Sequence, residues 1–106
     1  MPPRLSRRSL LGSLAAAPAL AGLPARAEPV TRSIPSTGEA MPVVGLGTWI
    51  TFNVGEDPLG LDACTEVMRA FFAAGGRMID SSPMYGSSEA VIGHGLDRLG
   101  GAPGLF

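Results

Sequence analysis

The sequence contains no lysine, and only one cysteine and one histidine. The lone cysteine, Cys64, excludes an internal disulfide bond and a metal site built from several thiolates. It falls on the apolar face of a predicted helix, with no histidine or cation close by in the sequence. We therefore interpret Cys64 as a small buried hydrophobic residue and not as a nucleophile.

Basic charge is scarce beyond the first residues. All eight basic residues are arginines, and four of them precede Glu28. Residues 28–106 carry four basic and nine acidic side chains, a formal charge of −5. Because phosphate binding requires a basic surface, we expect no nucleic-acid partner.

Long apolar runs are also missing. The uncharged stretch 10–23 is shorter than the roughly 20 residues that span a bilayer, and glycine, serine and proline dilute it. It follows Arg7 and Arg8 and ends near an Ala-Arg-Ala sequence at 25–27, which is the three-part layout of a secretory signal. No stable membrane anchor is expected.

The arginine pair followed by two leucines resembles a twin-arginine signal, which exports folded proteins across a bacterial inner membrane. We expect residues 1–27 to be this signal, with cleavage after Ala27, and residues 28–106 to be a periplasmic protein. An ordinary secretory signal, or a basic amphipathic start that is never cleaved, is the alternative interpretation.

The remaining composition indicates one folded domain at most. Apolar residues make up 45% of the chain and charged residues 16%, a balance typical of a globular protein. Short extended runs at 32–35 and 40–43 flank a glycine-containing turn at 36–39, which predicts a hairpin. The apolar run 43–49 predicts a buried strand, followed by a loop over 51–60.

A helix is predicted next, with Asp62 as its N-cap and Gly75-Gly76 as its end. Residues 77–82 predict a second strand and 83–87 a loop, so that strand, helix and strand form a parallel βαβ unit. A second helix is expected over 88–99, then a turn at 100–104 and the start of another strand at Leu105. The first helix has apolar residues at i, i+3, i+4, i+7 and i+8, and polar residues on its opposite face. Its apolar positions are Cys64, Val67, Met68, Phe71 and Phe72, and its polar positions are Thr65, Glu66 and Arg69.

Two side chains could carry chemistry. Asp80 lies where the second strand ends, and Tyr85 follows five positions later in the next loop. Loops at the carboxyl ends of parallel strands form the active face of βα repeats, so the two side chains can converge. A solvated carboxylate beside a packed phenol is the non-functional alternative.

The wider sequence resembles the aldo-keto reductase signature. The stretches that carry the resemblance are GLGTW at 45–49 and MIDSSPMYGSSE at 78–89. The likeness extends from about Ile34 to Leu99. A dinucleotide-binding Rossmann motif is disfavoured, because Ile50 stands where the third glycine of that motif would fall.

The resemblance implies an α/β fold, namely a (β/α)8 TIM barrel of which this chain holds the hairpin and the first two βα units. It also implies an NADP(H) cofactor and hydride transfer to or from the carbonyl carbon of a small carbonyl or alcohol substrate. Tyr85 would be the general acid, and Asp80 would orient a lysine that lowers the tyrosine's pKa. Thr48, Trp49 and Asp80 match positions that line the cofactor and substrate pocket.

The family's lysine and histidine have no counterpart here, because the chain lacks lysine and its only histidine, His94, falls in the second predicted helix. A complete barrel of this type has about 250 residues. We therefore expect residues 28–106 to be the incomplete N-terminal portion of an aldo-keto reductase, with unpaired strand edges and no activity alone. The alternative is a short exported, non-catalytic binding module that reuses this segment.

Overall fold

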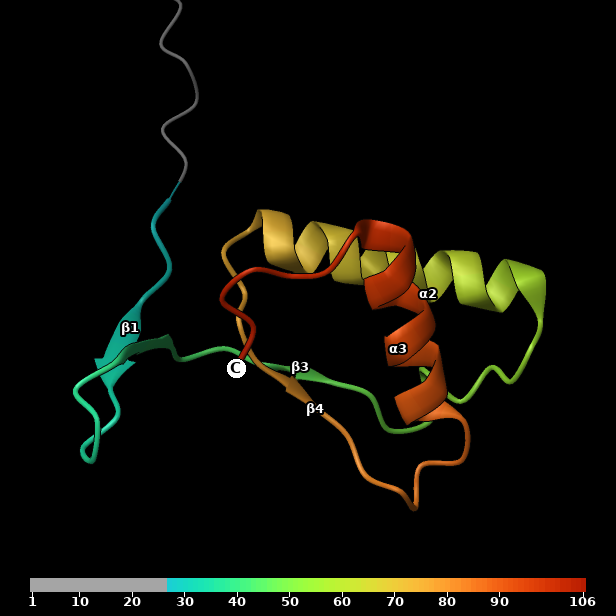
Figure 1. Cartoon of the computed structure of the whole chain (residues 1–106), viewed down its shortest axis with the longest axis horizontal. Coiled ribbons are helices and arrows are strands. Elements are labelled where there is room, and N and C mark those ends of the chain that lie inside the picture. The colour runs from blue at the N-terminus through green and yellow to red at the C-terminus, as the bar shows by residue number, and fades with distance from the viewer. Residues whose placement is uncertain (1–26) are drawn as a thin grey trace, which may run out of the picture.

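The computed structural model describes residues 27–106, so the predicted signal sequence lies outside the described residues except for its last residue, Ala27. Figure 1 shows a hairpin to one side and two helices that lie over a pair of short strands. Neither helix in the described part is long and apolar enough to cross a membrane.

The predicted hairpin is confirmed. Strands β1 (Thr31–Ser33) and β2 (Ala40–Pro42) pair antiparallel, with Arg32 opposite Met41. The turn closes because the Ile34 amide donates to the Glu39 carbonyl at 2.8 Å, while Gly38 adopts a φ of 74°. Glycine reaches this left-handed region without the steric cost that a Cβ atom brings.

The parallel pair is shorter than the sequence predicts. Strand β3 (Leu46–Gly47) pairs with β4 (Ile79–Asp80), with Gly47 in register with Asp80. The buried strand predicted over 43–49 is wrong in length and in burial, since Val44 is 69% exposed. Within residues 27–106 only β4 pairs with β3, and the two valines that precede β3 face a cavity that they share with Phe71 at the end of α2.

Helix α2 (Pro58–Ala73) begins earlier than predicted. Asp57, not Asp62, is its N-cap, and the Asp57 carboxylate accepts a hydrogen bond from the Gly60 amide at 2.8 Å. Pro58 occupies the first turn, where its fixed φ suits the helix and its missing N–H costs nothing. The predicted end is confirmed, because Ala74 is the C-cap and Gly75 has a φ of 92°.

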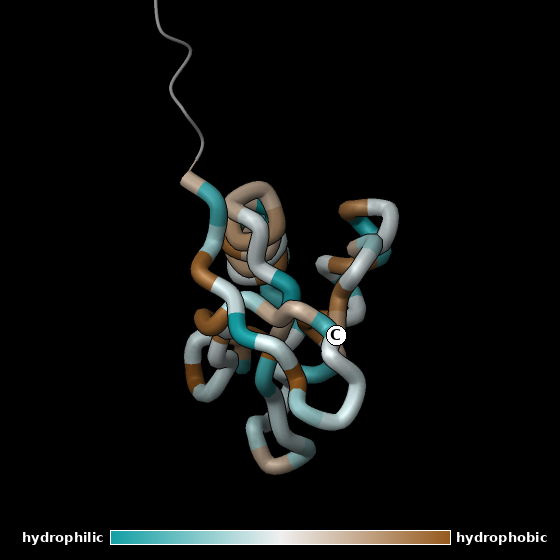
Figure 2. The backbone as a smooth tube through the Cα atoms, turned by 90° about the vertical axis from the view of Figure 1, so that its left-hand side faces the viewer, coloured by the Kyte–Doolittle hydropathy of each residue, from teal (hydrophilic) through white to brown (hydrophobic). Residues whose placement is uncertain are grey.

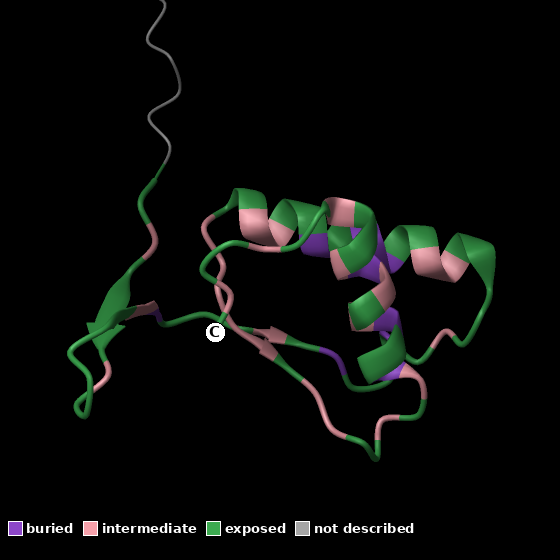
Figure 3. Ribbon diagram, viewed as in Figure 1, coloured by how far each residue is buried: buried purple, intermediate pink, exposed green. Residues whose placement is uncertain are grey.

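Helix α3 spans Ser88–Leu99, as predicted, and packs across α2 (Figures 1 and 3). Met68 of α2 and Val91 of α3 are almost fully buried in this contact. The prediction that Thr65 lies on the exposed face of its helix is wrong: Thr65 is 5% exposed, because α3 passes over that face and brings Gly95 close. The partly buried core residues packed around this contact include Leu61, Phe72, Ile92, Leu96 and Leu99.

The last residues run beside β4. The Phe106 amide donates to the Arg77 carbonyl at 2.7 Å, whereas the adjacent Met78 carbonyl accepts from Leu46 of β3 at 2.9 Å. Successive carbonyls of an extended chain point to opposite sides, so Phe106 lies on the side of β4 away from β3. No strand forms at Leu105 and Phe106, where the sequence predicts the start of one. The bond from Phe106 to Arg77 joins this segment to the residues just before β4.

The described residues thus form a small α/β unit with a separate hairpin, in keeping with a partial α/β fragment. The barrel itself stays a prediction. Figure 2 shows apolar segments on the outside of the unit as well as inside it. The large hydrophobic residues that are most exposed include Val30, Val44, Trp49, Ile50, Leu59 and Met84.

Candidate functional site

Two loops lie at the carboxyl ends of β3 and β4, over residues 48–57 and 81–87 (Figure 1). Because the two strands are parallel and in register, their loops emerge at the same end of the sheet. All four predicted site residues belong to this end. Thr48 and Trp49 follow β3, Asp80 ends β4, and Tyr85 lies in the loop after it.

Thr48 connects the two strands at this end. Its side chain is fully buried, and its hydroxyl donates to the Asp80 carbonyl at 2.7 Å. Its own carbonyl accepts from the Ser88 hydroxyl at 3.1 Å, in another buried contact. Thr48 therefore fixes both the end of β4 and the start of α3 relative to β3.

Trp49 stands next to this anchor but points outward, with 67% of its surface exposed. The following residue, Ile50, has a φ of 62°, in the left-handed region that a β-branched residue rarely adopts. A tight three-residue turn results, in which the Thr51 amide donates to the Trp49 carbonyl at 2.6 Å. The buried ring of Phe52 anchors the chain directly after this turn.

Asp80 is exposed and Tyr85 is half-buried. The Tyr85 amide donates to the Ser82 carbonyl at 2.9 Å, and its carbonyl accepts from the Ser88 amide at 3.2 Å, so the loop is closed on both sides of the phenol. Among residues 27–106, neither the Asp80 carboxylate nor the Tyr85 hydroxyl takes part in a hydrogen bond or ion pair, whereas the Asp80 backbone carbonyl accepts from Thr48. Both groups are thus free to meet a ligand.

A second link between the loops has no signal in the amino-acid pattern. The side-chain oxygen of Asn53 accepts from both the amide and the hydroxyl of Ser87, each at 3.0 Å. The Ser87 hydroxyl in turn accepts from the Gly55 amide at 2.8 Å. Ser87 precedes α3 without capping it through its side chain. The Ser87 hydroxyl is instead used between the two loops.

Other candidate groups lie elsewhere. Cys64 is buried and free, and burial raises the pKa of its thiol, which suits the buried hydrophobic residue that was predicted. His94 is half-buried within α3. In the part of the chain that the structure describes, no three acidic, histidine or cysteine side chains group to hold a metal ion.

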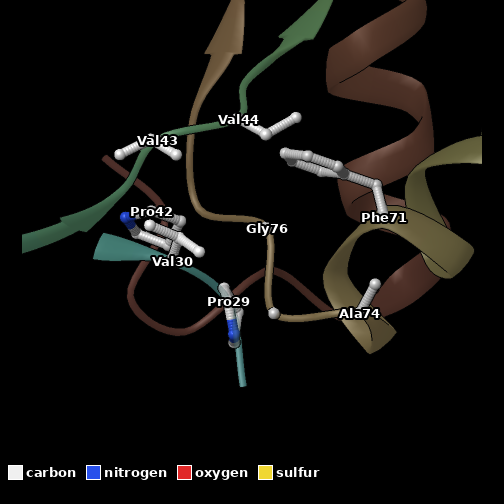
Figure 4. Close-up of a pocket in the computed structure, with 9 residues that line it drawn as sticks. Pro29, Val30, Pro42, Val43, Val44, Phe71, Ala74 and Gly76 are labelled. Carbon is white, nitrogen blue, oxygen red and sulfur yellow. The ribbon is translucent and has the colours of Figure 1, made fainter. Parts of the chain in front are cut away.

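A cavity of about 310 Å³ lies at the opposite end of the strands (Figure 4). Val43 and Val44 enter it from the segment before β3, Phe71 from the end of α2, and Pro29 from the segment before the hairpin. Its walls are almost wholly apolar, and none of the predicted site residues lines it. The cavity is thus separate from the polar loops.

Comparison with known proteins bears on the segment that holds both loops. Residues 43–103 match the model of the aldo/keto reductase family. Searches of curated proteins and of solved structures found no match. The matched region begins just before β3 and ends just after α3, so it contains every residue of the candidate site.

Proposed function

We propose that this chain, which belongs to the aldo/keto reductase family, provides part of the active site of an NADP(H)-dependent carbonyl reductase. In this proposal Tyr85 is the general acid that protonates the oxygen of a small carbonyl substrate. In the reverse direction it accepts the proton of an alcohol. Thr48, Trp49 and Asp80 line the side of the site where cofactor and substrate meet.

The observation that carries the proposal is the bond from the Thr48 hydroxyl to the Asp80 carbonyl. It holds the carboxyl ends of two parallel strands together within the segment that matches the family. Trp49, Asp80 and the Tyr85 loop all lie at this end of the sheet. Reactive groups that are held before the substrate arrives lose less entropy in the reaction.

The residues present fit the cofactor in part. The exposed Trp49 ring offers an aromatic surface, and the Ser81 hydroxyl beside Asp80 is buried without a partner among residues 27–106. The four arginines of this region lie on β1, α2, α3 and the segment before β4, and none lies in the two loops. The loops therefore suit the nicotinamide end, and they offer no cation to the phosphates.

NADP(H), when bound, supplies the hydride; the chain's own contribution is the proton at the Tyr85 oxygen. A phenol has a pKa of about 10 and releases its proton more readily beside a cation. The 106 residues contain no lysine to act as that cation. We therefore propose that the 106-residue chain by itself does not reduce carbonyl compounds. NADPH oxidation well above background by the purified chain would contradict this.

The decisive experiment supplies the remainder of the site. Residues 43–103 replace the corresponding segment of an active aldo/keto reductase, and turnover of a small aldehyde is measured. Tyr85→Phe should lower kcat by about 10²- to 10⁴-fold, the usual contribution of a general acid, with little change in KM. Asp80→Asn should also lower kcat.

The matched control is Asp97→Asn, which neutralises an exposed carboxylate of α3 outside both loops. It should leave turnover unchanged. An active chimera in which Tyr85→Phe has no effect would overturn the assignment of the acid. A chimera that binds ligand but never turns over would favour a non-catalytic binding module.

We further propose that residues 1–27 direct export through the twin-arginine route to the bacterial periplasm, without a lasting membrane anchor. The paired arginines and the short uncharged stretch after them support this proposal. N-terminal sequencing of the exported protein should begin at Glu28. Retention of the chain in the cytoplasm, or no loss of export when both arginines become lysines, would argue against this route.

A further inference from the structure

The first loop is bonded at two places to the end of the second loop and the start of α3, and the two places differ in burial. The contact between Thr48 and Ser88 is buried and belongs to the core. The contact between Asn53 and Ser87 lies at the surface. The first can be expected to support folding, whereas the second can be removed without opening the core.

The contact between Asn53 and Ser87 lies next to Gly86, the residue that follows Tyr85. Gly86 has a φ of 61°, and a Cβ atom at this position would overlap the side-chain amide of Asn53. The absence of a side chain at Gly86 thus lets Asn53 reach Ser87. The acceptor oxygen of Asn53 receives two hydrogen bonds there, and the Gly55 amide completes the link.

The same asparagine also closes the strained turn of the first loop. Its backbone amide donates at 3.1 Å to the carbonyl of Ile50, the residue with positive φ. Trp49 precedes that turn, and Tyr85 lies two positions before Ser87. Asn53 is therefore bonded to both segments that carry the aromatic side chains of the site.

We propose that Asn53 is a positioning residue, which holds the Tyr85 loop at a set place relative to Trp49 by accepting both hydrogen bonds from Ser87. Its consequence for catalysis rests on the proposed function, but its effect on the two loops does not. Only the acceptor oxygen is used in this contact. Aspartate should therefore replace asparagine here, and alanine should not.

The chain has one tryptophan and one tyrosine, so energy transfer from Tyr85 to Trp49 reports on this distance without any label. The experiment uses the full chain and compares the wild type with Asn53→Ala and Asn53→Asp. Asn53→Ala should alter the transfer efficiency and speed amide exchange at Ser87 by about two- to tenfold, the effect of losing one ordinary hydrogen bond. Asn53→Asp should restore both values.

The matched control is Glu56→Ala, an exposed residue of the same loop, which should leave both values unchanged. Helical circular dichroism and the unfolding midpoint separate a local change from loss of the fold. If Asn53→Ala fails to fold, Ser87→Ala tests the contact from the other side. It should speed exchange at Gly55, whose acceptor is lost, while the Ser87 amide keeps its bond.

The proposal would be overturned if Asn53→Ala kept the transfer efficiency and the Ser87 exchange rate of the wild type. It would also be overturned if Asn53→Asp failed to restore these two values. An equal effect of Glu56→Ala would do the same. None of these readouts involves turnover or cofactor. A failed reductase assay therefore leaves this result standing, and a failed positioning test does not touch the assignment of Tyr85.

Discussion

Ile50 is a β-branched residue in a left-handed backbone conformation, which its side chain disfavours. A left-handed backbone costs an ordinary L-residue about 1–2 kcal/mol, and a branched Cβ makes the crowding worse. At Ile50 the φ is 62°, and the side chain is 64% exposed, so it gains little from burial in return. Phe52, which is buried, and Asn53, which bonds to Ser87, hold the turn in place from its C-terminal side.

We predict that Ile50→Gly raises the free energy of unfolding by about 1 kcal/mol. Glycine removes the steric cost of the left-handed backbone, and this gain exceeds the loss that comes from the greater entropy of glycine in the unfolded chain. Urea unfolding followed by Trp49 fluorescence measures the change. Leu59→Gly is the control, since Leu59 is exposed on helix α2 and glycine weakens a helix. Destabilisation in both variants would contradict the strain at Ile50.

Helices α2 and α3 pack against each other where Met68 approaches Gly95. Met68 is fully buried between them, and it approaches Gly95 so closely that a Cβ atom there would lie 2.6 Å from the Met68 sulfur. A glycine within α3 would ordinarily weaken the helix. Here it allows the close crossing that buries Met68 and Thr65.

We predict that Met68→Ala lowers the free energy of unfolding by about 2–5 kcal/mol, because it leaves a cavity at the crossing of the helices. The neighbouring Val67→Ala should cost less than about 1 kcal/mol, since Val67 is 47% exposed. Thermal unfolding followed by circular dichroism compares the two variants. Similar losses would mean that the crossing is not the main source of stability.

Arg77, just before β4, links the hairpin and the C-terminal turn to this strand. Its guanidinium donates to the Gly104 carbonyl at 2.7 Å, to the Ala40 carbonyl at 2.9 Å and to the Glu39 carboxylate at 2.6 Å. The hairpin and the C-terminal turn are thereby attached at the end opposite to the candidate site. The pair with Glu39 is partly exposed, so the two carbonyl contacts carry much of the effect.

We predict that Arg77→Ala speeds amide exchange in residues 39–42 and 104–106 several-fold and leaves the protection of α2 and α3 unchanged. Hydrogen exchange read by mass spectrometry or NMR resolves these segments. Arg69→Ala is the control, because Arg69 is an exposed arginine that bonds to Glu66 within its own helix. Unchanged exchange in the hairpin would show that it is held by other contacts.

The features that sequence reasoning predicted correctly depend on neighbours within a few positions. The hairpin turn with Gly38, the end of α2 at Gly75 and the full extent of α3 each follow from local backbone preferences and periodicity. The predicted start of α2 is wrong, because Asp62 and Asp57 can both cap a helix. Pro58 decides between them.

The features that sequence reasoning missed join residues far apart in the chain. Thr48 meets the Asp80 carbonyl across 32 positions, Asn53 meets Ser87 across 34, and the buried pair of Thr48 and Ser88 spans 40. The burial of Thr65 and the exposure of Val44 likewise depend on where other segments pass.

The amino-acid pattern alone was enough to indicate the order of helices and strands, because this order depends on local geometry. It was also enough to indicate the parallel pair, because a strand, a helix and a second strand in succession favour parallel pairing. The residue types of the candidate site follow from the resemblance to a family and from side-chain chemistry. The folded chain was needed to show that Thr48 turns inward to support Asp80, that Trp49 points outward, and that Asn53 links the two loops. Hydrogen bonds between distant loops form only when packing brings their atoms within about 3 Å, and no local pattern encodes that distance.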